Sequence, residues 1–297
     1  MYMKEFELNE LPDTVYVTME ELDHRDMWKK LLKNKTIKEL SKKHEISIRN
    51  LYKYKEGNSG YPIKVLEKIL RVVSMKIHRA TIKTQRNSNI MKIKLPLKIT
   101  DDFSEFLGYL LGDGGIDHQW GVHMTSNDTE NLENFDFLIN RIFGQVKKQV
   151  YKYENRMTYY YPKILGLILT DTFKISKGSK VDTNSHIPEF ILDSMTQTMK
   201  KKFITSFYEC DGASKFIRIT QGGKSLKLPP KILSQIKNML TEFNFKNVII
   251  KPSSIYKTSK GERRRWVLNI SNSKERKKFR TLFSCKKLSQ LNIGSRV

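Results

Sequence analysis

The chain has 297 residues, 38% of them hydrophobic, so it can bury the cores of two domains or of one duplicated domain with an appendage. Its 55 Lys and Arg residues against 31 Asp and Glu residues give a formal charge of +24, which exceeds what solubility requires and indicates a polyanionic partner. A membrane is not expected as that partner, because no apolar run approaches the roughly 18 residues of a membrane-spanning helix, and nucleic acid is expected instead.

The two cysteines, Cys210 and Cys285, do not form a CxxC motif, and no signal peptide precedes them. The chain is therefore expected to be reduced and intracellular, located in the cytoplasm and with the nucleoid when DNA is bound. So few cysteines exclude a Cys-rich zinc site, and the six histidines are too scattered for a His-based one.

Residues 1–75 are predicted to form a small all-α domain that carries a helix-turn-helix. Thr36 with Glu39 has the pattern of a capping box, and Ser47 is a second N-cap after a short break. The second helix would expose polar and basic side chains toward a DNA major groove, namely those of Ser47, Arg49, Asn50 and Lys53. A plain helical hairpin is the alternative interpretation.

After a polar, basic stretch at residues 76–92, predicted to be a linker or an extended arm, the chain repeats one order of elements. In each copy an apolar helix that ends in Asp–Gly precedes a strand, a second helix, further strands and a third helix. Residues 93–180 are therefore expected to form one unit and residues 181–297 a second.

The two apolar helices match each other when they are aligned on their Asp–Gly pairs. Three positions correspond between LGYLLGDGG and ITSFYECDGA: Gly108 with Ser206, Gly112 with Cys210, and Asp113 with Asp211. Small residues four apart lie on one face of a helix, so two such helices can approach closely. The aspartates at their C-terminal ends are then expected to meet at one place.

Two carboxylates at helix C-termini repel each other and the helix dipoles, which is costly unless divalent cations neutralise them. Acids that bridge Mg²⁺, with Mn²⁺ as a substitute, suit two-metal hydrolysis of phosphodiesters, in which one ion activates water and another stabilises the leaving oxygen. One Asp–Gly pair after a helix would be an ordinary cap. Two copies in matching contexts favour a metal site.

From about Leu95 to the C-terminus the sequence resembles the LAGLIDADG family of homing endonucleases. Besides the motif helices, LPLKITDDFSEF and IPEFILDSMTQTMKKKF are similar to the segments that precede the family's two motifs. The resemblance implies an α+β fold of two pseudo-symmetric αββαββα units whose sheets form a saddle over the DNA major groove. A monomer with internal pseudo-twofold symmetry is expected.

The resemblance also implies a set of catalytic residues. The metal site is expected to comprise Asp113 and Asp211 with Gly112 and Cys210. A lysine often assists in the family, and Lys286 or Lys287 lies near the expected place in the second unit. The first unit has no lysine directly before Ile187, but Lys177 and Lys180 lie a little upstream, and Lys180 is the catalytic candidate.

The sheets are expected to contact DNA through side chains at every second strand position. Basic and polar residues follow the second motif and crowd a later hairpin: Lys215, Arg218 and Thr220, then Lys257, Lys260, Arg263, Arg264 and Arg265. These residues are predicted to contact bases or phosphates.

The favoured function is a site-specific, Mg²⁺-dependent endonuclease of the homing type that makes a double-strand break in duplex DNA. One alternative is a regulator that binds DNA through the same scaffold without cleaving it. The two aspartates argue against this alternative, and the uncertain lysine of the first unit favours it. The other alternative is an intron RNA maturase, whose basic saddle would bind structured RNA.

Overall fold

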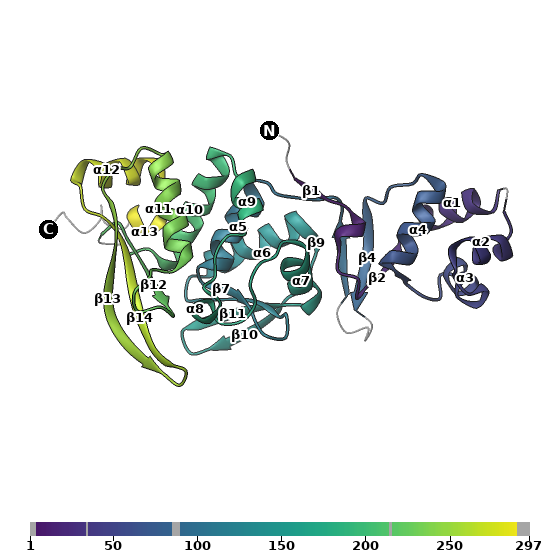
Figure 1. Ribbon diagram of the computed structural model, residues 1–297, viewed down its shortest axis with the longest axis horizontal. Coiled ribbons are helices and arrows are strands. Elements are labelled where there is room, and N and C mark those ends of the chain that lie inside the picture. The colour runs from purple at the N-terminus through teal and green to yellow at the C-terminus, as the bar shows by residue number, and fades with distance from the viewer. Residues whose placement is uncertain (1–3, 34, 85–89, 214–215, 290–297) are drawn as a thin grey trace.

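The computed structural model describes residues 4–33, 35–84, 90–213 and 216–289. The molecule is elongated, with an N-terminal module at one end, a first α+β unit in the middle and a second unit at the other end (Figure 1). Within the described residues, no helix combines the length and the apolar character that crossing a membrane requires.

The first unit has the element order αββαββα. Its elements are α5 (Asp101–Leu111), β7 (Gly114–Ile116), β8 (Val122–Ser126), α6 (Thr129–Phe143), β10 (Gln149–Tyr153), β11 (Arg156–Tyr161) and α7 (Lys163–Leu167), which continues into a π-helical turn, η2 (Ile168–Thr172). The strands form an antiparallel sheet in the order β10-β11-β8-β7. Helices α5 and α6 bury Phe103, Phe106 and Phe135, and the rings of Phe106 and Phe135 stack between the two helices with centroids 5.2 Å apart, so each helix is held by its apolar face.

The second unit repeats this order with one strand reduced. Its elements are α10 (Gln197–Asp211), β12 (Arg218–Gly223), α11 (Lys231–Glu242), β13 (Val248–Thr258), β14 (Gly261–Ile270) and α12 (Ser273–Leu282). The sheet order is β12-β14-β13, and a single bridge between Gly212 and Ile219 stands where the first unit has the β7–β8 pair. The predicted α+β fold of two αββαββα units is confirmed in element order, with this one difference in the second unit.

Three short helices complete the two units. They are α8 (Lys180–Thr183) and α9 (Glu189–Ser194), which connect the units, and α13 (Lys286–Ser289) after α12. The long β13–β14 hairpin and the β10–β11 hairpin reach the lower edge of Figure 1, whereas α9, α11 and α12 lie along its upper edge. The two hairpins therefore project from the same side of the molecule (Figure 1).

The N-terminal module contains the predicted helix pair but is not all-α. Helix α2 (Ile37–His44) begins with the Thr36–Glu39 capping box, and Ser47 caps α3 (Ile48–Lys55), as predicted. The other helical elements are α1 (Glu21–Leu32), α4 (Ile63–Val73) and the 3-10 turn η1 (Leu8–Glu10). The strands are β1 (Glu5–Phe6), β2 (Val15–Met19), β3 (Tyr61–Pro62), β4 (Arg79–Thr84), β5 (Ile90–Lys94) and β6 (Leu97–Lys98).

The prediction of an all-α domain followed by a linker at residues 76–92 is therefore wrong. Strands β4 and β5 lie largely within that stretch and pair with each other. Ala80 and Ile82 in β4, and Met91 and Ile93 in β5, are buried at alternating positions between exposed or half-buried polar residues. This period of two identifies half-buried strands, and the basic composition of the stretch concealed it.

The module is joined to the first unit by a sheet, because the order β3-β2-β4-β5-β9 includes the short strand β9 (Gly144–Gln145) that follows α6. Gly144 has φ +102°, and a Cβ atom there would lie 2.3 Å from the Lys92 carbonyl oxygen, so only glycine allows this pairing. Strand β1 also pairs with β6, and Phe6 packs edge-on against Phe173 with ring centroids 4.8 Å apart. The N-terminal module is thus fixed to the first unit by strand pairing and by packing.

Candidate functional site

Helices α5 and α10 cross in direct contact at the four small residues predicted for their interface. A Cβ atom on Gly108 would lie 2.0 Å from Ser206 Oγ, and one on Gly112 would lie 2.5 Å from Cys210 Cβ. The Ser206 hydroxyl donates within its own helix to the Lys202 and Phe203 carbonyls, so it adds no unsatisfied polar atom to the contact. Backbone approach this close brings the two helix C-termini together.

Asp113 and Asp211 lie at the C-terminal ends of the two crossing helices, close enough to interact electrostatically. Burial is the main cause that raises the pKa of Asp211 to about 6; the charge of Asp113 raises it further, and Lys180 opposes both effects. Burial also raises the pKa of Asp113, while Lys180 and Lys287 lower it. The two carboxyl groups therefore share one partly desolvated site with both lysines.

The two lysines occupy equivalent positions in the two units. Lys180 Nζ donates to the carbonyl of Gly112, and Lys287 Nζ donates to the carbonyl of Cys210 at 2.6 Å. Each accepting residue directly precedes one of the aspartates. Burial lowers the pKa of Lys180, against the raising effects of Asp211 and Asp113. The place left uncertain in the first unit is occupied by Lys180.

The other lysine candidates point elsewhere. The side chain of Lys286 pairs with Glu130, and its backbone N–H donates to Glu209. Lys177 lies over the ring of Trp120, with Nζ 3.2 Å from the centroid. Of the catalytic lysines predicted, Lys180 and Lys287 face the aspartates, and Lys286 does not.

Two neighbours of the aspartates were not predicted from the sequence. Gln221 Nε2 donates to Asp211 Oδ2 at 2.6 Å, and the charge of Arg156 helps to lower the pKa of Asp113. Gln221 lies in the strand that follows the second motif, so it could have been found by its place in the repeat. Arg156 begins β11, more than forty positions after the motif, and no local signal marks it.

A polar cavity of about 490 Å³ opens beside Asp113. It is lined by Asp113, Thr125, Ser126, Asn127, Asp128, Asn131, Arg156, Glu209, Cys210 and Lys287. Asp211 does not line this cavity, and one of its carboxylate oxygens accepts from Gln221 at 2.6 Å. The two aspartates therefore have different neighbours.

The donor set fits a hard divalent cation. The two carboxylates and the carbonyl oxygens of Gly112 and Cys210 are the oxygen ligands that Mg²⁺, Ca²⁺ and Mn²⁺ prefer. The Cys210 thiol lies in the helix contact and burial raises its pKa, so the carbonyl and not the sulfur is the plausible donor. Among the described residues, no group of three His, Cys, Asp or Glu side chains is placed to hold a metal ion.

Part of the predicted DNA-contacting set lies on one exposed face of the second sheet. Arg218 and Thr220 are exposed, and β12 pairs with β14 so that Gly222 lies opposite Arg265 on the same face. The guanidinium of Arg265 also lies over the Tyr256 ring at 5.4 Å. Lys215 lies outside the described residues.

The other predicted hairpin residues have partners within the chain or lie on the other face of the sheet. Arg263 is only 7% exposed and donates to Asp182 at 3.0 Å, which also binds Lys260 at 2.7 Å. Arg264 donates to the Leu226 carbonyl at 2.6 Å, and strand register places it and Lys257 on the opposite face of the sheet. These side chains were assigned to DNA from composition alone, whereas an acidic residue far along the chain and the strand register determine where they point.

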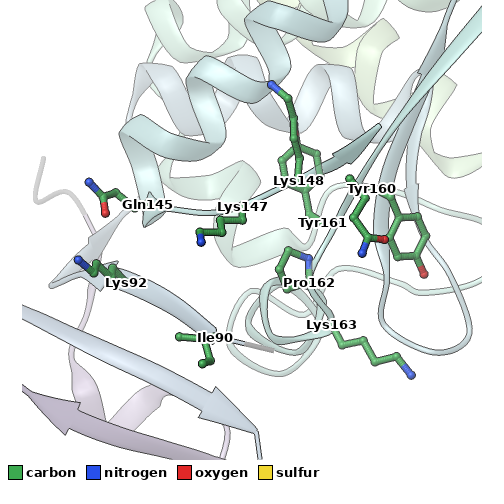
Figure 2. A pocket seen from close by; sticks show the side chains of 10 residues that line it. Ile90, Lys92, Gln145, Lys147, Lys148, Tyr160, Tyr161, Pro162 and Lys163 are labelled. Carbon is green, nitrogen blue, oxygen red and sulfur yellow. The ribbon is translucent and has the colours of Figure 1, made fainter. Parts of the chain in front are cut away.

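A basic cleft separates the N-terminal sheet from the first unit. Figure 2 shows Ile90 and Lys92 of β5 on one side and Lys147, Pro162 and Lys163 on the other. Its volume is about 660 Å³, and its remaining lining residues are Gln145, Lys148, Gln149, Tyr160 and Tyr161. Lys148 pairs with Asp136 at 2.5 Å, but neither Lys92 nor Lys147 forms an ion pair with a described residue. Lys92 and Lys147 therefore bring positive charge to this cleft.

The second helix of the predicted helix-turn-helix presents its polar face to solvent. Arg49, Asn50 and Lys53 are exposed, and Leu51 and Tyr54 are buried on the opposite face. Ser47 is exposed but its hydroxyl accepts the Asn50 N–H as a helix cap, at 3.2 Å. The side chains of the other three predicted contact residues take no part in this cap.

No model of a known protein family matches the sequence. Among solved structures, mesophilic variants of the homing endonuclease I-DmoI are 19% identical, with 66% of this chain and 98% of that chain covered and a TM-score of 0.45. I-DmoI in complex with DNA and Ca is 20% identical over 66% of this chain and 98% of that chain, with a TM-score of 0.44. Full-length DUF199/WhiA from Thermatoga maritima is 12% identical over 65% of this chain and 58% of that chain, with a TM-score of 0.39. The element order and the paired motif helices agree with the two αββαββα units that the resemblance to the LAGLIDADG family implies.

Proposed function

We propose that the protein is a site-specific endonuclease that hydrolyses duplex DNA with divalent metal ions. The observation that carries this proposal is the paired centre: Asp113 and Asp211 meet at the end of the helix contact, and each aspartate is preceded by a carbonyl that binds a lysine. The aspartate and the lysine of each half of the centre would act on one DNA strand.

The residues of the centre suit phosphodiester hydrolysis. Asp113 and Asp211, with the Gly112 and Cys210 carbonyls, would hold divalent cations, which stabilise charge on the phosphate and make a bound water more acidic. Lys180 and Lys287 bring positive charge to the same place, where they can stabilise the developing negative charge or hold a water. Gln221 orients one oxygen of Asp211 through its hydrogen bond of 2.6 Å.

The remaining surface suits a DNA duplex. The formal charge of +24 provides an attraction for phosphates that does not depend on sequence. Arg218, Thr220 and Arg265 on one sheet face are the proposed groups for base or phosphate contact in the second unit. Since both units belong to one chain, a single copy would engage both halves of an asymmetric site.

The test uses purified protein, Mg²⁺ and a supercoiled plasmid that carries the genomic locus of its open reading frame without the insertion. Cleavage at one position, lost with EDTA and restored by Mg²⁺ or Mn²⁺, is the expected result. The matched control is Asp193→Asn, an aspartate in α9 outside the centre, which should cut like the parent protein. No cleavage by the parent protein across a range of metal, salt and temperature would contradict the proposal.

A second candidate is a DNA-binding regulator, and the exposed polar face of α3 favours it. In that case the protein would retard a defined promoter fragment in a gel without nicking it, and Asp113→Asn or Asp211→Asn would leave retardation unchanged. Structured RNA added as a competitor tests the maturase alternative in the same assay.

A further inference from the structure

Lys180 reaches the centre from a helix of only four residues. Helix α8 begins at Lys180, with Ser179 as its N-cap, and ends at Thr183, followed by the C-cap Asn184 with a left-handed backbone. A single helical turn has little stability of its own, because nucleation costs more than one turn of hydrogen bonds returns. Contacts from elsewhere in the molecule must therefore hold α8, and with it Lys180, in place.

The first unit holds the segment before α8, where the Gly178 N–H donates to the Ile116 carbonyl at 2.6 Å, and the second unit holds α8 itself. Asp182 in α8 accepts from Lys260 Nζ at 2.7 Å and from Arg263 Nη2 at 3.0 Å, both in or beside the β13–β14 hairpin. The hydrogen bond from Lys260, and then that from Arg263, lowers the pKa of Asp182. The Arg263 side chain is only 9% exposed, so solvent competes little with its half of the cluster. We call these three residues the Asp182 cluster.

Side-chain packing also holds α8 against the second unit. A Cβ atom on Gly222 of β12 would lie 3.0 Å from Val181 Cγ2 and 2.5 Å from the Tyr256 hydroxyl, so the missing side chain leaves space that α8 and the hairpin share. Lys231 at the start of α11 also donates its backbone N–H to the Asn184 side chain at 3.0 Å. Helix α8 precedes the second motif in the chain but is seated on the sheet of the second unit.

Lys287, the other lysine of the centre, is held in place through a contact with the first unit. Helix α13, which carries Lys287, is the end of the second unit, yet Lys286 beside it pairs with Glu130 of α6 in the first unit. Glu209 of α10 accepts the Lys286 backbone N–H. Each lysine of the centre is therefore fixed by a charged residue of the other unit.

We propose that Asp182 is a positioning residue: through Arg263 and Lys260 it couples the β13–β14 hairpin to Lys180 and so controls cleavage of one DNA strand. This inference rests on the proposed function. Since Lys287 is held by different residues, loss of the Asp182 cluster would leave the other strand's cleavage intact. The two strands would then be cut at unequal rates, and the product would be a nicked circle.

The experiment compares Asp182→Asn with its conservative rescue, Asp182→Glu, on supercoiled plasmid under single-turnover conditions, with each strand labelled separately. Asp182→Asn should slow one strand about 10-fold, because small displacements of a catalytic group have effects of this order, and nicked circles should accumulate. DNA affinity and the rate on the other strand should stay within about twofold, and Asp182→Glu should recover the slowed strand.

The matched control is Glu189→Gln, which removes the Glu189–Lys231 ion pair of 2.7 Å between α9 and the second unit, a pair of similar length in another short helix. It should change neither strand. Equal slowing of both strands by Asp182→Asn, or no slowing of either, would overturn the inference. A general loss of stability would produce equal slowing, so the strand bias separates positioning from folding.

A second readout does not depend on cleavage. The backbone amides of Thr183 and Ser185 donate to the carbonyls of Ser179 and Lys180, at 3.0 and 2.9 Å, and report on whether α8 is folded. Asp182→Asn should speed hydrogen exchange at these two amides at least about fivefold and leave the Leu288 amide in α13 unchanged. Unchanged exchange at Thr183 and Ser185 would overturn the inference even if the protein proved not to cut DNA, so the two proposals can fail separately.

Discussion

The two halves of the centre have the same backbone plan in different surroundings. Asp211 accepts a hydrogen bond from Gln221 and burial raises its pKa to about 6, whereas Asp113 borders a polar cavity and the charge of Arg156 helps to lower its pKa. Small residues at the helix contact impose the symmetry of the backbone, and the later elements of each unit supply the asymmetry. The comparison teaches that one duplicated frame can present two chemically different half-sites to the two strands of one duplex.

The largest expected effect is the loss of either aspartate, which would show whether the two halves are equally necessary. Asp113→Asn and Asp211→Asn should each reduce cleavage on the order of 10³-fold or more, because a neutral amide binds a divalent cation far more weakly than a carboxylate. Plasmid cleavage at saturating Mg²⁺ is the measurement. A variant that still cuts at one tenth of the parent rate would remove that aspartate from the metal site.

The next effect is on stability and distinguishes the two carboxyl groups by pH. An acid whose folded pKa lies above its unfolded value of 3.8 destabilises the metal-free protein increasingly as pH rises from about 4 to about 6, because the folded state then binds more protons than the unfolded state. Relative to the parent, Asp211→Asn should therefore gain about 3 kcal/mol across that window and no more above it. Urea unfolding in EDTA at a series of pH values measures this difference.

Asp113→Asn is the comparison for that experiment. Burial also raises the pKa of Asp113, but this residue borders the polar cavity. The gain in unfolding free energy of Asp113→Asn should therefore have the same sign and a smaller size. A larger gain for Asp113→Asn than for Asp211→Asn would reverse the assignment of the more desolvated acid.

Substitution of Lys180 and of Lys287 should slow cleavage of different DNA strands. Lys180→Met should slow one strand and Lys287→Met the other, each about 10²-fold, the usual size for removal of one charge-stabilising group. Strand-specific end labels on a linear duplex measure both rates. Lys277→Met, an exposed lysine of α12, should stay within about threefold and serves as the control. Slowing of the same strand by both lysine variants would break the pseudo-symmetric interpretation.

The helix contact that makes the halves equivalent should tolerate little added volume. Gly108→Ala places a methyl group 2.0 Å from Ser206 Oγ and 2.6 Å from the Phe203 carbonyl, so the helices must separate. Overpacking of this kind costs about 1–3 kcal/mol. Thermal or urea unfolding measures it, and Ser206→Ala, which removes an atom from the facing position, should cost less than about 1 kcal/mol. Equal costs would mean that the contact relaxes freely.

The smallest expected effect concerns the basic cleft beside the first unit, which has no equivalent described in the second. If duplex DNA that extends beyond the saddle enters this cleft, Lys92→Ala and Lys147→Ala should each reduce the slope of log affinity against log salt by about one. Fluorescence anisotropy with a long and a short duplex makes the comparison, and Lys237→Ala on α11 is the control. Loss of slope on the short duplex as well would place these lysines within the saddle's own footprint.

The sequence alone determined the features that depend on near neighbours. The capping box at Thr36, the cap at Ser47 and the small residues at Gly108 and Ser206 were all readable, because helix starts and helix faces are set by residues three or four positions apart. The repeat then placed Asp113 opposite Asp211 without any knowledge of distances. The central acids therefore came from local pattern and duplication, and the fold class came from the resemblance to the LAGLIDADG family.

Only the tertiary structure decided which partner each charged or alternating residue takes. Arg263 is directed to Asp182 and not to solvent, Lys287 and not Lys286 faces the acids, and the basic stretch after α4 becomes two sheet strands. Composition cannot rank such choices, because a lysine or arginine is drawn equally to any acid or phosphate within reach. Which group is within reach is fixed by packing between segments that lie far apart in the chain.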